Sequence, residues 1–292
     1  MNELVHRLIS GYHVAVRMLR HEVIDASPAQ WRLAADTLAR LYLPPKDLQV
    51  RQHDWHGLQT DIISRSGTNP DAQPIVWIHG GGFAFCSPRT HRAAASALAA
   101  VTRREVWLPD YPLAPEAPYP QALDALHQIP DRQPLDIIGD SAGGNLALAW
   151  ALRRGCADRL ALLSPWVDLR VDGASTITPV DDHSAFDRED LREYSGMYLS
   201  GAPATDPDCS PIMATDDALI RLGKVYIESG TDELLHADAA ALANRMKAAG
   251  VALDVHTQQR VHHAWQLFPD ILPEAKQSIL RMGDFFGKAD DQ

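Results

Sequence analysis

Residues 135–150, LDIIGDSAGGNLALAW, decide the fold, because an apolar run breaks into glycine and serine and then resumes with helical character. The first part predicts a buried strand, and the alanine-rich end predicts a helix. Between them, Gly139-x-Ser141-x-Gly143 has the spacing of a nucleophile elbow, in which small neighbours let a strained turn expose a serine hydroxyl. We therefore predict that Ser141 lies at the tip of a strand–turn–helix unit.

The composition is that of a globular protein of 292 residues, with 46% hydrophobic and 22% charged residues. This length suits one large α/β domain. A formal net charge of -11 disfavours nucleic acid and anionic membranes as partners. Neither a signal peptide nor a membrane span is predicted, so we expect a cytoplasmic protein. The three scattered cysteines form no C-x-x-C pair, which disfavours a disulfide framework and a thiolate metal site.

Strand patterns alternate with helix patterns along most of the chain, which predicts an α/β fold with a mostly parallel sheet covered by helices on both faces. Strands are predicted at 48–55, 58–64, 74–79, 105–109, 135–139, 160–164, 224–229 and 253–257. Helices are predicted at 3–20, 28–43, 91–101, 120–128, 144–153, 236–249 and 270–286. The first two strands are joined by little more than Gly57, which favours an antiparallel hairpin at the sheet edge.

The segment 165–222 interrupts this alternation, since it is long and rich in Asp, Ser, Thr and Pro. We interpret it as an insertion over the sheet. The expected organisation is one catalytic domain, with N-terminal helices at 1–45 and an α/β core at 46–164 and 223–292.

A serine nucleophile needs a histidine to take its proton and a carboxylate to orient that histidine. In folds of this type the acid and then the histidine follow the serine, each after a later strand. Asp232 is our predicted acid, because it follows a strand and its turn directly, whereas Glu233 is expected to point elsewhere and start the next helix. A helix N-cap is the alternative role for Asp232. His262 and His263 follow the last strand, and spacing alone does not rank them.

The sequence HGGGF at 79–83 ends a predicted buried strand in three glycines. Such a run exposes backbone N–H groups that can bind a developing oxyanion. A flexible turn is the alternative reading. We expect His79 to be a structural hydrogen-bonding residue and not a base. The serine, histidine, acid and oxyanion donors together need no metal and no organic cofactor.

Three motifs in this order, HGGG, DYPLAPE and GDSAGG, resemble the hormone-sensitive-lipase-like family of α/β-hydrolase esterases, and the resemblance runs from about residue 48 to the end. It implies an α/β-hydrolase fold with an eight-stranded sheet and a helical cap formed by 1–45 and 165–222. It also implies Ser141 as nucleophile and Asp232 as acid. The implied oxyanion donors are Gly81, Gly82 and Ala142.

The resemblance also separates the two histidines. The family pattern Gly-Met-x-His-x-aromatic places the aromatic residue on Trp265 and the base on His263, which leaves His262 at the variable position. The chain departs from the family where Arg260-Val261 replaces Gly-Met and where Pro112 replaces an arginine.

The function implied is that of a serine carboxylesterase that hydrolyses short-chain acyl esters of small molecules through an acyl-enzyme. Homodimers occur among proteins that resemble this one. The alternatives are an amide, carbamate or formamide hydrolase with the same triad, and a non-catalytic small-molecule receptor on the same fold. Trp166, Phe83 and Phe85 are expected either to line the substrate pocket or to pack in the core.

Overall fold

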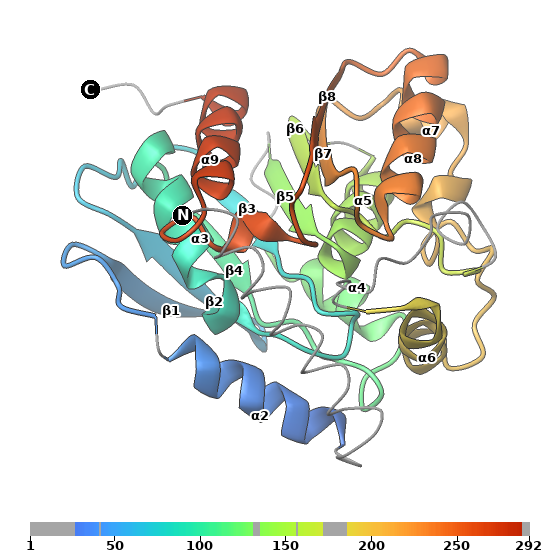
Figure 1. The fold of residues 1–292 in the computed structure, drawn as a ribbon, viewed down its shortest axis with the longest axis horizontal. Coiled ribbons are helices and arrows are strands. Elements are labelled where there is room, and N and C mark those ends of the chain that lie inside the picture. The colour runs from blue at the N-terminus through green and yellow to red at the C-terminus, as the bar shows by residue number, and fades with distance from the viewer. Residues whose placement is uncertain (1–26, 41, 131–134, 156, 172–185, 288–292) are drawn as a thin grey trace.

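The computed structural model describes residues 27–40, 42–130, 135–155, 157–171 and 186–287. Its centre is an eight-stranded sheet in the order β1-β2-β4-β3-β5-β6-β7-β8 (Figure 1). The strands are β1 Gln49–Trp55, β2 Leu58–Ser64, β3 Ile75–Ile78, β4 Val106–Pro109, β5 Asp136–Asp140, β6 Arg159–Leu163, β7 Lys224–Gly230 and β8 Leu253–Gln258. Among the strand pairs of the described residues, only β1–β2 and β2–β4 are antiparallel. The predicted edge hairpin and mostly parallel sheet are confirmed.

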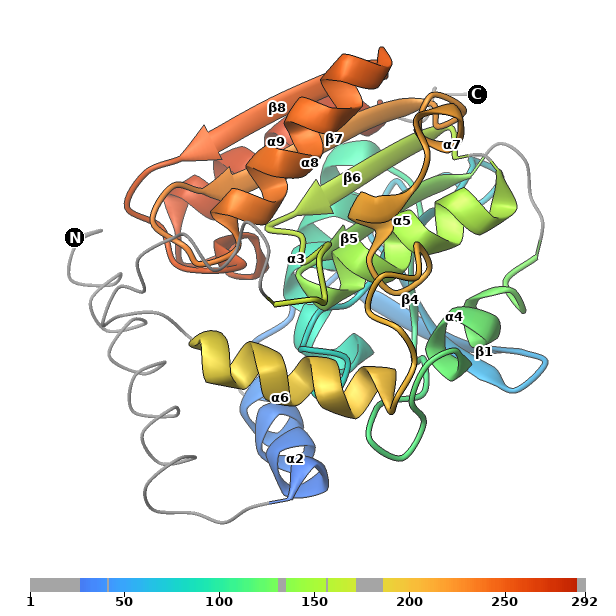
Figure 2. The ribbon, with the colours of Figure 1, turned by 90° about the vertical axis from the view of Figure 1, so that its right-hand side faces the viewer.

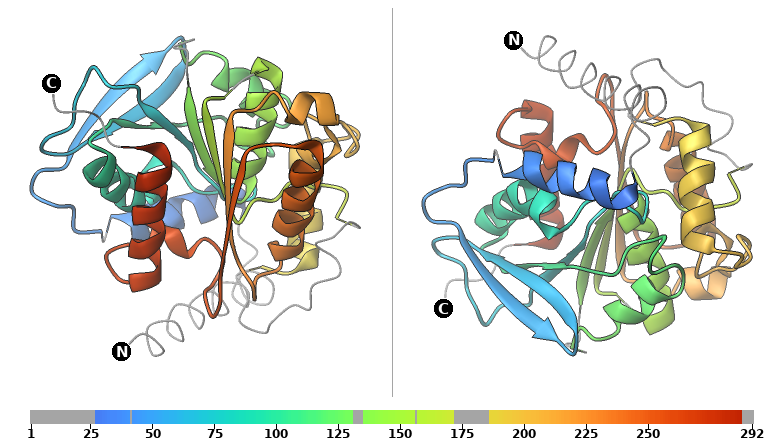
Figure 3. Two further views of the ribbon diagram at one scale, coloured as in Figure 1. Left: turned by 90° about the horizontal axis from the view of Figure 1, so that it is seen from above. Right: turned by 90° about the horizontal axis from the view of Figure 1, so that it is seen from below.

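Helices cover both faces of this sheet (Figure 3). The α-helices are α2 Pro28–Ala39, α3 Pro88–Thr102, α4 Gln121–Leu126, α5 Ala142–Arg154, α6 Arg188–Leu199, α7 Asp216–Leu219, α8 His236–Ala249 and α9 Pro273–Phe286. Alternate strand residues face opposite ways: Ile75 and Trp77 of β3 pack with α3 and α9, whereas Val76 and Ile78 join the cluster that contains α5 and α8. Two apolar cores therefore hold the sheet from both sides.

Two helices, α2 and α6, lie outside these layers (Figure 2). In the chain, α2 precedes the first strand, and α6 follows β6 and precedes β7. α6 belongs to the interval 165–222 that lacked the regular alternation, and α2 ends at Ala39, earlier than the predicted end at residue 43. The predicted helix at 3–20 lies outside the described residues. The division into a core at 46–164 and 223–292 and a cap at 1–45 and 165–222 stays a prediction. None of the described helices combines the length and the apolar character that a bilayer crossing demands.

Candidate active site

Ser141 sits at a sharp turn between β5 and α5, with φ 55° and ψ -123°. Such a conformation is strained for a residue with a side chain, and the turn is held on both sides. The Ser141 N–H donates to the Leu163 carbonyl at 2.9 Å, and the Ser141 carbonyl accepts from the Trp166 N–H at 3.0 Å. A Cβ at Gly143 would overlap backbone carbonyl groups at the end of β3, so this crossing of helix and strand requires glycine. The sequence therefore builds the predicted strand–turn–helix unit around Ser141.

The carboxylate that contacts one of the two histidines after β8 is that of Glu233. His263 Nδ1 lies 2.6 Å from Glu233 Oε2, and Glu233 Oε1 accepts from the Gly230 N–H at 2.7 Å. Glu233 is buried, with 3% of its surface exposed. Because Nδ1–H donates to this carboxylate, His263 presents Nε2 as its acceptor.

This arrangement corrects the prediction of Asp232 as the orienting acid. Asp232 is exposed, and its carboxylate accepts from the Arg260 N–H at 2.9 Å and the Thr231 hydroxyl at 3.1 Å. In the turn after β7, Thr231 is partly exposed and Asp232 is exposed. Glu233 is the first acidic residue after β7 whose side chain is buried. Glu233 also does not start the next helix, since α8 begins at His236. Asp232 therefore holds the loop before the histidines and does not hydrogen bond His263.

The two adjacent histidines have different surroundings. The His262 Nδ1 lies 3.0 Å from the His263 carbonyl oxygen, and its ring packs edge-on against Phe268. His263 packs edge-on against Phe186, with ring centroids 4.8 Å apart. His263 therefore contacts the buried Glu233 carboxylate, whereas His262 contacts residues of the loop that carries it.

The glycine loop after β3 has backbone angles that favour glycine. Gly81 has φ 110° and Gly82 has φ 58°, in the left-handed region that favours glycine. The Gly81 carbonyl accepts from the N–H groups of Ala84 and Phe85, which closes a tight turn. Among the described residues, no protein acceptor takes the N–H of Gly81, Gly82 or Ala142. These three amides are the ones that the sequence analysis predicts as oxyanion donors.

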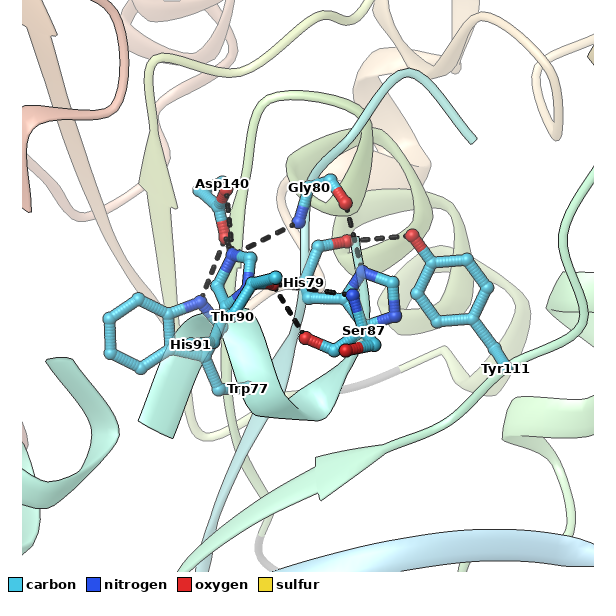
Figure 4. A network of polar contacts seen from close by, with 8 residues as sticks. All are labelled: Trp77, His79, Gly80, Ser87, Thr90, His91, Tyr111 and Asp140. Carbon is cyan, nitrogen blue, oxygen red and sulfur yellow. Dashed lines mark hydrogen bonds and ion pairs between the residues drawn. The ribbon is translucent and has the colours of Figure 1, made fainter. Parts of the chain in front are cut away.

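A buried polar network joins this loop to the elbow (Figure 4). Asp140 precedes the serine and accepts from the Trp77 indole N–H at 2.9 Å and from His91 Nε2 at 3.1 Å. Burial alone would raise the pKa of the Asp140 carboxyl, but the facing His91 and Trp77 lower it below its ordinary value. A Cβ at Gly80 would overlap the Asp140 carboxylate. The first glycine of the loop is therefore fitted against the residue before Ser141.

His79 begins the glycine loop and is fully buried. Its Nδ1–H donates to the Gly80 carbonyl at 2.8 Å, and its ring stacks on Tyr111 at 4.2 Å. Burial and the neighbouring His91 lower the pKa of His79 to about 3, so the ring is neutral at pH 7. These contacts give His79 a structural role at the base of the loop.

The aromatic residues near the site divide into two groups. Phe83 and Trp166 are buried, and Phe83 stacks on Tyr198 of α6 at 3.9 Å, so both pack in the core. Phe85 is half-buried and meets Tyr194 of α6 edge-on at 5.1 Å. Sequence reasoning missed Tyr194, whose ring also packs directly on Gly82.

Comparisons with known proteins give the family of the chain. Residues 75–267 match the sequence profile of the family described as alpha/beta hydrolase fold. An acetyl-hydrolase of Streptomyces hygroscopicus is 30% identical over 98% of this chain and 96% of its own. An esterase of Acinetobacter venetianus is 31% identical over 90% of this chain and 89% of its own. An esterase structure from the bacterial hormone-sensitive lipase family has a TM-score of 0.83 at 30% identity, covering 95% and 96% of the two chains.

The fold and the profile match make the chain a member of the α/β-hydrolase family, and it is a hydrolase. Within that family it is similar to esterases of the hormone-sensitive lipase group, as the three motifs indicated. In the part of the chain that the structure describes, no group of three or more His, Cys, Asp or Glu side chains is arranged to hold a metal ion.

Proposed function

We propose that the chain is a serine carboxylesterase in which Ser141, His263 and Glu233 form the triad. The hydrogen bond of 2.6 Å between His263 and the buried Glu233 carries this proposal. The Ser141 turn, Glu233 and His263 follow β5, β7 and β8, which run parallel in one sheet, so all three lie at the same sheet edge. A serine at a strained turn and an oriented histidine at the same sheet edge are the two groups that acyl transfer requires.

In the proposed reaction the Ser141 hydroxyl attacks the ester carbonyl while His263 Nε2 takes its proton. Glu233 stabilises the imidazolium that forms, without itself taking the proton. The N–H groups of Gly81, Gly82 and Ala142 receive the oxyanion. His263 then protonates the leaving alcohol, and water repeats the sequence on the acyl-enzyme to release the acid.

Short acyl esters are the proposed substrates. The names of the relatives, acetyl-hydrolase and esterase, support this class. The ring of Tyr194 on Gly82 adds a physical reason, since it takes up space beside a proposed oxyanion donor. Cytoplasmic residence and a homodimer stay predictions of the sequence.

A substrate panel tests the proposed class. We expect the purified protein to hydrolyse p-nitrophenyl acetate and butyrate, with kcat/KM falling for the decanoate, and to act on p-nitroacetanilide at least about 10²-fold more slowly, because an amide has a poorer leaving group. The Ser141→Ala variant supplies the background rate for each substrate. Faster hydrolysis of the anilide would identify an amidase. No turnover above background on any substrate would favour a receptor on this fold.

A further inference from the structure

The loop that carries Gly81 and Gly82 needs to be held from outside, because Gly81, Gly82, Phe83 and Cys86 all have positive φ. Three of its carbonyl groups accept from main-chain N–H groups or from the neighbouring His79. The Gly80 carbonyl accepts from His79, the Gly81 carbonyl accepts from within the loop, and the Phe83 carbonyl accepts from the Ala114 N–H at 2.9 Å. The Ala84 carbonyl, in contrast, is bound by a side chain from a distant helix.

That side chain is Arg32 of α2. Its Nε donates to the Ala84 carbonyl at 2.7 Å, and its Nη2 donates to the Ala114 carbonyl at 2.5 Å and to Glu116 Oε2 at 2.7 Å. The guanidinium therefore bridges the glycine loop and the segment after β4. Since the Ala114 N–H also holds Phe83, the two segments and Arg32 form a closed set of hydrogen bonds.

A second contact from α2 reaches the end of the same loop. The Ser87 hydroxyl donates to Asp36 Oδ1 at 2.5 Å, and Ser87 is the N-cap of α3. Arg32 and Asp36 are four residues apart, so they lie on one face of α2. This face of α2 therefore forms hydrogen bonds with the loop at both Ala84 and Ser87.

We propose that Arg32 is a positioning residue for the oxyanion hole, and this inference rests on the proposed function. Its planar guanidinium supplies several N–H donors in a fixed geometry, which a lysine cannot reproduce. Charge-assisted hydrogen bonds of this kind are stronger than neutral ones. They hold the Ala84 carbonyl and so fix the orientation of the preceding Gly81 and Gly82 amides. An amide displaced by about 1 Å from the developing oxyanion can cost about 10²-fold in rate.

The test compares four variants on p-nitrophenyl butyrate. For Arg32→Ala we expect kcat to fall about 10- to 100-fold with KM changed less than about threefold, because the oxyanion is stabilised in the transition state. Arg32→Lys should show a similar fall, since one ammonium does not bridge both carbonyls. Glu116→Gln keeps both carbonyl bonds and should stay within about threefold of the wild type. Arg40→Ala, which replaces the exposed arginine at the C-cap of the same helix, is the matched control and should match the wild type.

Rescue separates positioning from general loss of stability. Added guanidinium chloride should restore part of kcat to Arg32→Ala and none to the Ser141→Ala variant, at concentrations that leave the thermal midpoint unchanged. A kcat for both Arg32 variants within about twofold of Arg40→Ala, or a loss confined to KM, would overturn the inference. Wild-type activity in Ser141→Ala would instead overturn the proposed function, so the two failures are distinguishable. If Arg32→Ala does not fold, the kcat of Arg32→Lys relative to Arg40→Ala decides whether the inference holds.

Discussion

Replacing His263 by alanine is expected to lower kcat for p-nitrophenyl butyrate about 10⁶-fold, because no other group then takes the proton of Ser141. His263 is the histidine whose Nδ1 is bound by a buried carboxylate, which leaves Nε2 as the acceptor. His262→Ala is the matched neighbouring change, and we expect a loss of less than about tenfold from disturbance of the loop. Initial rates and KM should be measured for both variants at pH 8.

The thermal midpoint of each histidine variant should be measured alongside, so that unfolding is not mistaken for lost catalysis. A third variant with both Ser141→Ala and His263→Ala should lose little more than either single change, since residues of one triad act together. A collapse of activity in His262→Ala with near-normal rates in His263→Ala would reverse the assignment.

Glu233→Gln is expected to lower kcat about 10³- to 10⁴-fold, because an amide in place of the carboxylate no longer stabilises the imidazolium or enforces its tautomer. The variant keeps the size of the side chain and an oxygen for the Gly230 N–H. Asp232→Asn is the matched control one residue earlier, and it should retain activity within about threefold, since Asp232 is exposed and binds a backbone N–H. The measurement is kcat across pH 6 to 9 for both variants.

A large loss in Asp232→Asn together with a small one in Glu233→Gln would contradict the geometry at this turn. A double-mutant cycle with His263→Ala sharpens the comparison. Glu233→Gln should cost little once His263 is gone, because its proposed effect on rate acts through that imidazole.

The parallel sheet was predictable because its strands and the helices between them each leave a pattern in a short stretch of sequence. Buried parallel strands are short apolar runs, and the helices between them have a period that single stretches of sequence reveal. The strand 58–64 and the helix 236–249 agree with the structure at both ends. Other ends shifted by a few residues, as for α3, where Ser87 caps the helix and Pro88 starts it before the apolar pattern begins.

The carboxylate that contacts His263 was mispredicted, because tertiary packing decides which side chain of the turn after β7 is buried. Asp232 and Glu233 are adjacent acidic residues. Which of the two side chains is buried depends on the length and path of the turn. The signal that was available is the apolar pair Leu234-Leu235, which is buried together with Glu233. The Arg32 contacts could not have been predicted, since they join residues 52 and 82 positions apart.

The central claim is that Ser141 is a nucleophile activated by His263, and covalent labelling tests it most directly. A fluorophosphonate probe should add one phosphonyl group per chain, and mass spectrometry of the peptides should locate it on Ser141. The rate of labelling should drop at least about 10³-fold in His263→Ala, because the histidine activates the hydroxyl. Label on another residue, or no faster labelling of the wild type than of Ser141→Ala, would contradict the account.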